Sequence, residues 1–470
     1  MKQHNALICI HYVSGMSQTY TEEIASFISD TNYDDIPTRA IMEVKRIILD
    51  CVGCALAGIG TDVAKIVINL ASSFAAGGNS SLLGSSVKTN MLLAAFVNTT
   101  LINSMDYEPV GPEGHCSAVA IPVSFATGET SSSGKEILTS IALGLEVGGR
   151  VGASIRQSST GQKKYSPLVH GHTFTAISAV VTAAKIFHLS EEQILDSLGL
   201  AGYSAPVPSM RKAFSTLPVP MTHFDFIGIS AYNGILSALL GRDGLIGDRS
   251  VFDGDLGFWR FSGSDGCAWE HLTGELGKKW YVENMHYKHY PVILYNQPII
   301  DCATKIVRNN NVLPKDIDSI KIQMRNPPKE WSSKDVRNQA DAWRSVPFFI
   351  SAAVHDLPPN RWQYPEAICD SSVKELMNKV VLESFPGVTE RRISAVDSPA
   401  SVEINANGRV YVEEKALLEP MTEKELIAKF QQNVQQILSN EQIARVIEII
   451  FDLENIDNVG ELMSIVTAPR

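Results

Sequence analysis

The chain has 470 residues, of which 44% are hydrophobic and 19% charged, and a formal net charge of −11. This is the composition of a globular protein, and its length predicts two or three compact units. The acidic balance argues against a nucleic-acid partner, and the lack of about 18 consecutive apolar residues argues against a membrane span. Seven cysteines without regular spacing, and no secretory signal, predict a cytoplasmic protein without a disulfide framework.

Residues 1–17 are interpreted as an N-terminal tail, and clear helical periodicity begins at Asp35. Asp35 can cap a helix that runs to about Gly58, and Pro37 then occupies the first turn, where proline is tolerated. Further apolar stretches rich in alanine, glycine and serine follow at 91–104, 118–129, 136–153, 173–187 and 228–241. Because small residues let helices approach closely, these stretches predict a compact bundle of buried helices.

The pattern changes after about residue 270. Residues 316–324 alternate between polar and apolar, which predicts a half-buried strand, and residues 401–414 predict a hairpin that turns at Asn407-Gly408. Capping-box patterns predict helices that begin after Ser190 and after Thr422. We therefore predict a mainly α fold, in which a large all-helical domain (residues 18–270 and 419–470) is interrupted by a smaller α/β lid domain (residues 271–418).

The sequence contains no HExxH motif, no paired CxxC motifs and no glycine-rich phosphate loop, so we expect neither a metal nor an organic cofactor. Cys51 and Cys54 have CxxC spacing, but they lie in an apolar helix without a second pair, which favours a place in the core. The segment 241–247 follows a helix rather than a strand, and it is interpreted as a turn.

A short polar loop between two apolar stretches is the strongest candidate for an active site. It holds Asp106, Glu108, Glu113 and His115 among two prolines and two glycines. A carboxylate and an imidazole held between rigid helices are the groups that general acid–base catalysis needs. The alternative is a capping loop, in which Asp106 and His115 satisfy the ends of helices.

Two further polar segments supply histidines and cations. Residues 163–172 place His170 and His172 at the start of an apolar helix, and residues 285–291 place Lys288 among histidines and tyrosines. Lys288 and His223 are candidates for the local positive charge that an anionic substrate requires. Taken alone, each segment is more often surface or core than active site.

Several stretches of the chain resemble the MmgE/PrpD family, whose members include 2-methylcitrate dehydratase, cis-aconitate decarboxylase and iminodisuccinate epimerase. The resemblance covers most of the chain after residue 20 and is carried by the segments 47–58, 144–150, 231–234 and 288–291. It implies an all-helical domain with an inserted α/β lid, and a homodimer.

The resemblance also identifies candidate catalytic positions. Asp106 matches the first acid of the family's active-site motif, and His115 with Ser117 matches its histidine and serine. The loop between them is shorter here and lacks the family's second acid pair and threonine. The next histidine of the family falls near position 169, so His170 or His172 would take its place.

Other family positions hold different residues in this chain. The family's lysine aligns with His223, its later histidine aligns with Gln297, and a tyrosine before the lid helix is Phe348. Glutamine donates a hydrogen bond but does not shuttle a proton at neutral pH. The loss of the lysine charge further predicts a substrate less anionic than a tricarboxylate.

We therefore predict a cofactor-independent lyase, either a dehydratase or a decarboxylase, that transfers protons beside a carboxylate or carbonyl of a small organic acid or specialised metabolite. His115 would be the general acid or base, Asp106 would orient it or take part in proton transfer, and His170 or His172 with His223 would complete the catalytic group. The residues expected to bind substrate are Lys288, Arg150, Ser117, Gln297 and Tyr290.

Two alternatives stay open. The same fold could carry an isomerase or epimerase, in which a proton leaves one face of the substrate and returns to the other, so that two opposed bases are needed. The chain could instead be a dimeric binding protein without catalytic activity.

Overall fold

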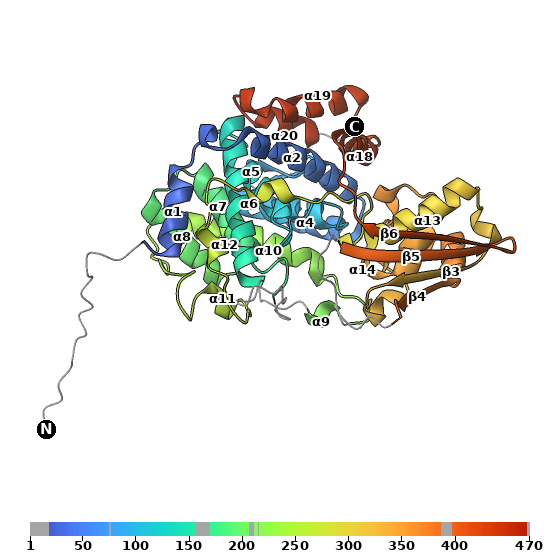
Figure 1. Cartoon of the computed structure of the whole chain (residues 1–470). Helices are drawn as coiled ribbons and strands as arrows, with labels where there is room; N and C mark the ends of the chain where they lie inside the picture. Colours follow the sequence, from blue (N-terminus) through green and yellow to red (C-terminus); the bar gives the residue numbers. More distant parts are fainter. Residues whose placement is uncertain are drawn as a thin grey trace, which may run out of the picture.

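The computed structural model describes residues 18–74, 77–156, 169–205, 211–214, 216–386 and 397–467. It is mainly helical, as the sequence predicts (Figure 1). The first part of the chain forms α1 (Tyr20–Asp30), α2 (Thr38–Gly58), α3 (Asp62–Ser72), α4 (Met91–Asn103), α5 (Ser117–Gly128), α6 (Gly134–Arg156), α7 (Thr175–Ile186), α8 (Glu191–Tyr203), α9 (Arg211–Phe214), α10 (Thr222–Arg242), α11 (Phe258–Phe261) and α12 (Glu270–Thr273). The short strands β1 (Ser80–Ser81) and β2 (Lys88–Thr89) pair between α3 and α4.

The start of α2 differs from the prediction. Its N-cap residue is Pro37, so the helix begins at Thr38, and Asp35 belongs instead to the preceding 3-10 turn, where its carboxylate accepts a hydrogen bond from the Asn32 amide at 2.8 Å. The physical reason is that proline disfavours helical backbone in the residue before it, and Ile36 is extended. The capping boxes predicted at Ser190 and Thr422 are both present.

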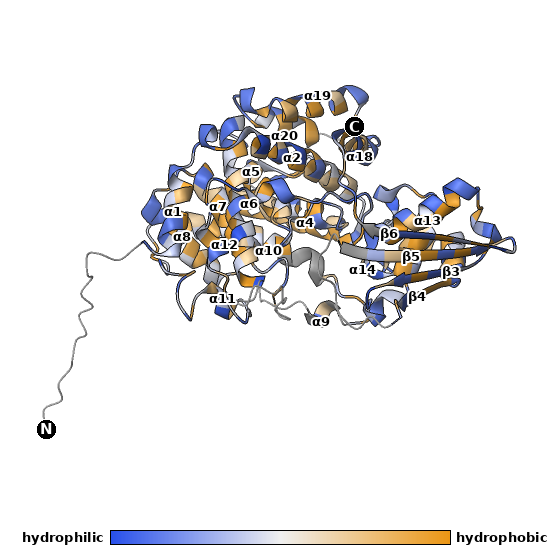
Figure 2. Cartoon of the chain, viewed as in Figure 1, coloured by the Kyte–Doolittle hydropathy of each residue, from blue (hydrophilic) through white to orange (hydrophobic). Residues whose placement is uncertain are grey.

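The helices of this first part pack through small residues. On α10, a Cβ added at Gly234 would lie 2.2 Å from the Cβ of Ala179 on α7, so the two helices can approach this closely only because position 234 is glycine. Apolar colouring is concentrated on the surfaces that the helices turn towards one another, and polar colouring on the outside (Figure 2). The buried Cys51 and Cys54 belong to this interior, as predicted.

A second hydrophobic core forms between residues 292 and 406 around a four-stranded sheet. The strands, in the order β4 (Val380–Ser384), β3 (Ile317–Met324), β5 (Asp397–Ala406) and β6 (Arg409–Leu417), are antiparallel except for the parallel pair β3–β4. The alternation predicted for β3 is confirmed by the burial of Ile320, Ile322 and Met324. The hairpin turns at Asn407 and Gly408, whose φ angles are 52° and 74°.

Helices accompany the sheet along the chain. They are α13 (Gln297–Asn310), α14 (Gln339–Arg344), α15 (Val346–Val354), α16 (Pro365–Cys369) and α17 (Ser371–Met377). Helix α13 packs on β5 and β6, and α14 lies between the sheet and the helical body (Figure 1). The last helices, α18 (Glu423–Val434), α19 (Asn440–Phe451) and α20 (Gly460–Val466), return to the first hydrophobic core.

Among the described residues, no single helix combines the length and the apolar character needed to cross a membrane. Helices α2 and α3 meet both criteria only as a pair, and the chain bends by 90° between them.

Candidate active site

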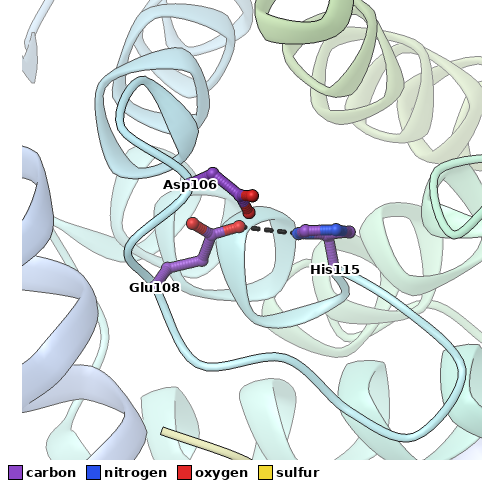
Figure 3. A group of neighbouring side chains, drawn as sticks. All are labelled: Asp106, Glu108 and His115. Carbon is purple, nitrogen blue, oxygen red and sulfur yellow. Dashed lines mark hydrogen bonds and ion pairs between the residues drawn. The ribbon is translucent and has the colours of Figure 1, made fainter. Parts of the chain in front are cut away.

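The loop between α4 and α5 buries a cluster of acid and imidazole groups. Asp106 and Glu108 follow the end of α4, and His115 precedes the start of α5 (Figure 3). His115 Nδ1 lies 2.7 Å from Glu108 Oε1, and Asn103 Nδ2 donates to the same oxygen at 2.7 Å. The side chains of Asp106 and Glu108 are 4% and 0% exposed, whereas His115 is 15% exposed, so the imidazole is the part of this cluster nearest to solvent.

Two residues distant in sequence hold the Asp106 carboxylate. Lys288 forms a buried ion pair with one carboxylate oxygen and donates to the Asp106 carbonyl at 2.7 Å. Trp343 Nε1 donates to the other carboxylate oxygen at 2.9 Å. The backbone of Asp106 has a φ of 52°, a left-handed conformation that costs energy for any residue other than glycine. This uncommon backbone conformation lies at the predicted site, within the contacts of Lys288 and Trp343.

The charge of Glu108 determines the protonation pattern of His115. Burial alone would raise the pKa of Glu108, but the positive charge of Lys288 and the hydrogen bond with His115 outweigh it, so this pKa is lowered. An ionised carboxylate only accepts hydrogen bonds, so His115 Nδ1 is the donor in this contact, and the proton-accepting nitrogen of the neutral imidazole is Nε2. Glu108 was part of the predicted polar loop, but sequence reasoning did not select it as the partner of His115.

The predicted histidines at the start of α7 lie beside this loop. The ring of His172 packs edge-on against His115 at a centroid distance of 4.7 Å, and His170 packs in the same way against His172. The His115 amide also donates to the Gly171 carbonyl at 3.3 Å. The three imidazoles are therefore contiguous. The rest of the predicted polar segment, residues 163–168, lies outside the described residues.

A close contact between two glycines sets the spacing of these histidines. A Cβ added at Gly114 would lie 2.3 Å from the Gly171 carbonyl oxygen, whereas one at Gly171 would lie 3.1 Å from the Gly114 Cα. We expect Gly114→Ala to separate His115 from His172, lowering turnover by about 100-fold, the scale of a misplacement of about 1 Å. Gly171→Ala, which needs only a small adjustment, serves as the control. Equal turnover of both variants would show that the contact does not position the histidines.

The spacing of the three acid–base groups also suits a metal ion. Ligand atoms of Asp106, Glu108 and His115 all lie within 4.8 Å of one another. However, the Lys288 ammonium pairs with Asp106 and lowers the pKa of Glu108, so a divalent cation would meet a fixed positive charge. The donor set thus fits a proton-transfer group beside a fixed cation better than a metal centre.

Ser117 and Gln297, both predicted to bind substrate, make backbone contacts. Ser117 Oγ donates to the Pro109 carbonyl and so ties α5 to the loop. The Gln297 amide accepts from the backbone of His289 and Tyr290 at 3.0 Å and donates to the Tyr290 carbonyl at 2.9 Å, so it fixes the segment that follows Lys288.

The remaining predicted residues also have other surroundings. The ring of Tyr290 stacks on the ring of Trp362, with 5.6 Å between the ring centroids. Arg150 pairs with Glu146 at 2.5 Å, and its other nitrogens donate to backbone carbonyls between residues 271 and 279. These contacts connect α6 to that segment rather than to Asp106. His223 lies in the first turn of α10, but its side chain is outside the described part of the structure.

A second buried ion pair, which sequence reasoning missed, supports the loop from the C-terminal helices. Lys429 on α18 pairs with Asp50 on α2 at 2.8 Å and donates to the Tyr107 carbonyl at 2.9 Å. Burial raises the pKa of Asp50 although Lys429 opposes this effect. No local pattern links these residues, because they meet only after the last helices return to the first core.

The chain matches known proteins over most of its length. Family models for the MmgE/PrpD N-terminal and C-terminal domains match residues 22–268 and 290–455. Cis-aconitate decarboxylase of Homo sapiens is 25% identical over 487 residues, which cover 97% of this chain and 96% of that protein. The cis-aconitate decarboxylase-like protein oryM of Aspergillus oryzae is 22% identical over 484 residues, covering 95% and 97%. Cis-aconitate decarboxylase of Mus musculus is 23% identical over 477 residues, covering 97% and 94%. With both domain models matched in order along the chain, this protein belongs to the MmgE/PrpD family.

Proposed function

We propose that the chain is a lyase that decarboxylates or dehydrates a small organic acid without a metal or organic cofactor. The observation that carries the proposal is the buried Glu108–His115 pair beside the Asp106–Lys288 ion pair. Together these provide a proton-transfer group and a fixed cation in one water-poor site. Several relatives that this chain matches over most of their length are named as cis-aconitate decarboxylases or as similar to them, which supports a lyase reaction.

Lys288 and His115 have different roles in the proposed reaction. Lys288 holds a substrate carboxylate, because two of the hydrogen bonds of its ammonium go to Asp106 and a third N–H remains to donate. In dehydration, neutral His115 takes a proton from the carbon beside that carboxylate as the hydroxyl group leaves. In decarboxylation, imidazolium His115 protonates the carbon that receives the electron pair left by carbon dioxide.

The substrate carries fewer negative charges than cis-aconitate. A family lysine is replaced at His223, and the side chains of Arg150 and Gln297 bind backbone instead. Among the described residues around Asp106, Glu108 and His115, Lys288 is the cation paired directly with the cluster. Because this one ammonium already faces the carboxylates of Asp106 and Glu108, the described cluster has little positive charge left for a tricarboxylate.

Turnover of a panel of acids in D2O tests the proposal. Purified protein, with and without EDTA, is incubated with cis-aconitate, unsaturated dicarboxylates and hydroxy acids, and products are followed by NMR and mass spectrometry. A lyase releases carbon dioxide or water, and EDTA leaves the rate unchanged. Deuterium incorporation without loss of mass identifies an epimerase instead. Binding of an acid without any conversion would support the binding-protein alternative and contradict the proposal.

We also propose that the protein forms a homodimer through an apolar face on α3, α4 and α10. Such a face marks an interaction site on a folded protein. A surface groove between these helices is lined by Leu70, Leu93, Phe96, Ile229 and Tyr232. Around it, large apolar side chains that are between 36% and 59% exposed lie along α3, just past its end and along α10: Ile66, Leu70, Phe74, Ile229, Leu236 and Leu240.

A single charge on this face is expected to dissociate the dimer. In a two-fold interface Ile229→Glu introduces its charge twice, so we expect the dissociation constant to rise at least about 100-fold. Sedimentation velocity at several protein concentrations measures this change. Leu313→Glu, at a similarly exposed position elsewhere, is the control. A dimer that survives Ile229→Glu unchanged would place the interface on another surface.

A further inference from the structure

The short helix α14 contacts both the acid loop and the chain that leads into α10. Gln339 and Trp343 are four residues apart and share one face of α14. Gln339 Nε2 donates to the Ser104 carbonyl at 2.5 Å, and Trp343 Nε1 donates to the Asp106 carboxylate at 2.9 Å. One helix face thus holds both the backbone and the side chain of the loop.

Two other residues of α14 bind the segment before α10. The Asp341 carboxylate accepts from the Val219 amide at 3.2 Å, and Arg344 donates to the Ala213 carbonyl at 3.1 Å. Ala340 and Trp343 pack with Val219 in a small hydrophobic cluster that is separate from the two main cores. Helix α14 therefore joins the loop of Asp106 to the segment that ends in the first turn of α10.

The loop depends on contacts of this kind because its backbone is strained and buried. Successive carbonyls accept from side chains far away in sequence, and Gln363 Nε2 donates to the Met105 carbonyl at 2.8 Å and to the Pro291 carbonyl at 2.9 Å. Gln339 and Gln363 also bond to each other at 3.4 Å. These donors surround Asp106, whose φ of 52° is uncommon outside glycine, and we expect them to hold its conformation.

We propose that Trp343 and Gln339 are positioning residues, and that α14 couples the α/β part of the chain to the geometry of the Asp106 carboxylate. The indole N–H fixes the direction of the carboxylate, and the Gln339 amide fixes the backbone that presents it. The effect on turnover rests on the proposed function, but the effect on the loop does not.

The test compares two buried tryptophans, each of which donates a hydrogen bond from its indole N–H. Trp343→Phe removes the donor to Asp106 and keeps most of the ring. Trp280 is equally buried but lies outside the cluster of Asp106, Glu108 and His115, and its indole N–H donates to the Gly277 carbonyl at 3.3 Å. Trp280→Phe removes this donor. For the full chain we measure kcat and KM on the best substrate, the thermal midpoint, and hydrogen exchange of peptides that contain residues 104–108.

We expect Trp343→Phe to lower kcat by about 10- to 100-fold, the usual effect of losing a partner that orients a site residue, with KM changed less than about threefold. Exchange at residues 104–108 should rise, whereas Trp280→Phe should change neither quantity at a similar thermal midpoint. Faster exchange in a protein that converts no acid would support positioning and contradict the proposed function. An active Trp343→Phe variant with unchanged kcat and exchange would overturn the positioning role.

Discussion

Replacing Lys288 by methionine is expected to abolish useful turnover and to destabilise the fold. The ammonium is 1% exposed and pairs with an Asp106 carboxylate that is 4% exposed, so its removal leaves a buried charge without a partner. Breaking such a pair costs about 3–5 kcal/mol. The loss of a fixed cation at the reacting group lowers kcat by about 100- to 1000-fold. Denaturant unfolding and steady-state kinetics measure the two effects.

A double variant and a matched lysine separate stability from catalysis. Lys288→Met combined with Asp106→Asn removes both charges and should recover much of the stability without the activity. Lys45 is equally buried, pairs with Glu454 and donates to the Phe451 carbonyl at 2.8 Å. Lys45→Met should therefore destabilise the chain but keep kcat. Full turnover of Lys288→Met would remove Lys288 from the proposed mechanism.

Changing Glu108 to glutamine is expected to lower kcat by as much as about 10⁴-fold while keeping the fold. The ionised carboxylate accepts the Nδ1 proton of His115 at 2.7 Å. An amide can instead donate to Nδ1, which moves the imidazole proton to Nε2 and removes the base. The serine-protease triad loses activity on this scale when its carboxylate becomes an amide.

The neighbouring acid in the same loop is the control. Glu113 lies 3.8 Å from Arg156 and has no direct bond to His115 among the described contacts, so Glu113→Gln should retain most activity. His115→Ala removes the imidazole and should match the loss in Glu108→Gln, because the two act as a unit. An active Glu108→Gln variant alongside an inactive His115→Ala variant would show that the tautomer does not matter.

The sequence predicted those parts of the fold whose signals are local. The capping boxes at Ser190 and Thr422 and the turn at Asn407-Gly408 depend on residues only a few positions apart, so each could be recognised before folding. The predicted start of α2 was wrong because two local signals competed. Proline disfavours helical backbone in the residue before it, and this effect of Pro37 prevailed over capping by Asp35.

The candidate site was predictable only in part, because only some of its residues are close together in the sequence. The loop with Asp106 and His115 stands out as a polar segment between apolar helices. Trp343, Gln339 and Lys429 reach it across long stretches of chain, and nothing near them in sequence indicates their partner. Gln297 and Arg150 are predicted substrate ligands whose polar atoms bond to protein groups in the structure: backbone atoms for Gln297, and Glu146 with backbone carbonyls of a distant segment for Arg150.

The hydrogen bond from Lys429 to the Tyr107 carbonyl has a consequence for how the protein is synthesised. During synthesis the ammonium of Lys429 follows Tyr107 by 322 residues, so the acid loop is made long before this contact can form. Asp50 is likewise made long before Lys429, with which it forms an ion pair. Truncations before α18 would therefore keep the loop residues but lack the ammonium that binds the Tyr107 carbonyl and pairs with Asp50.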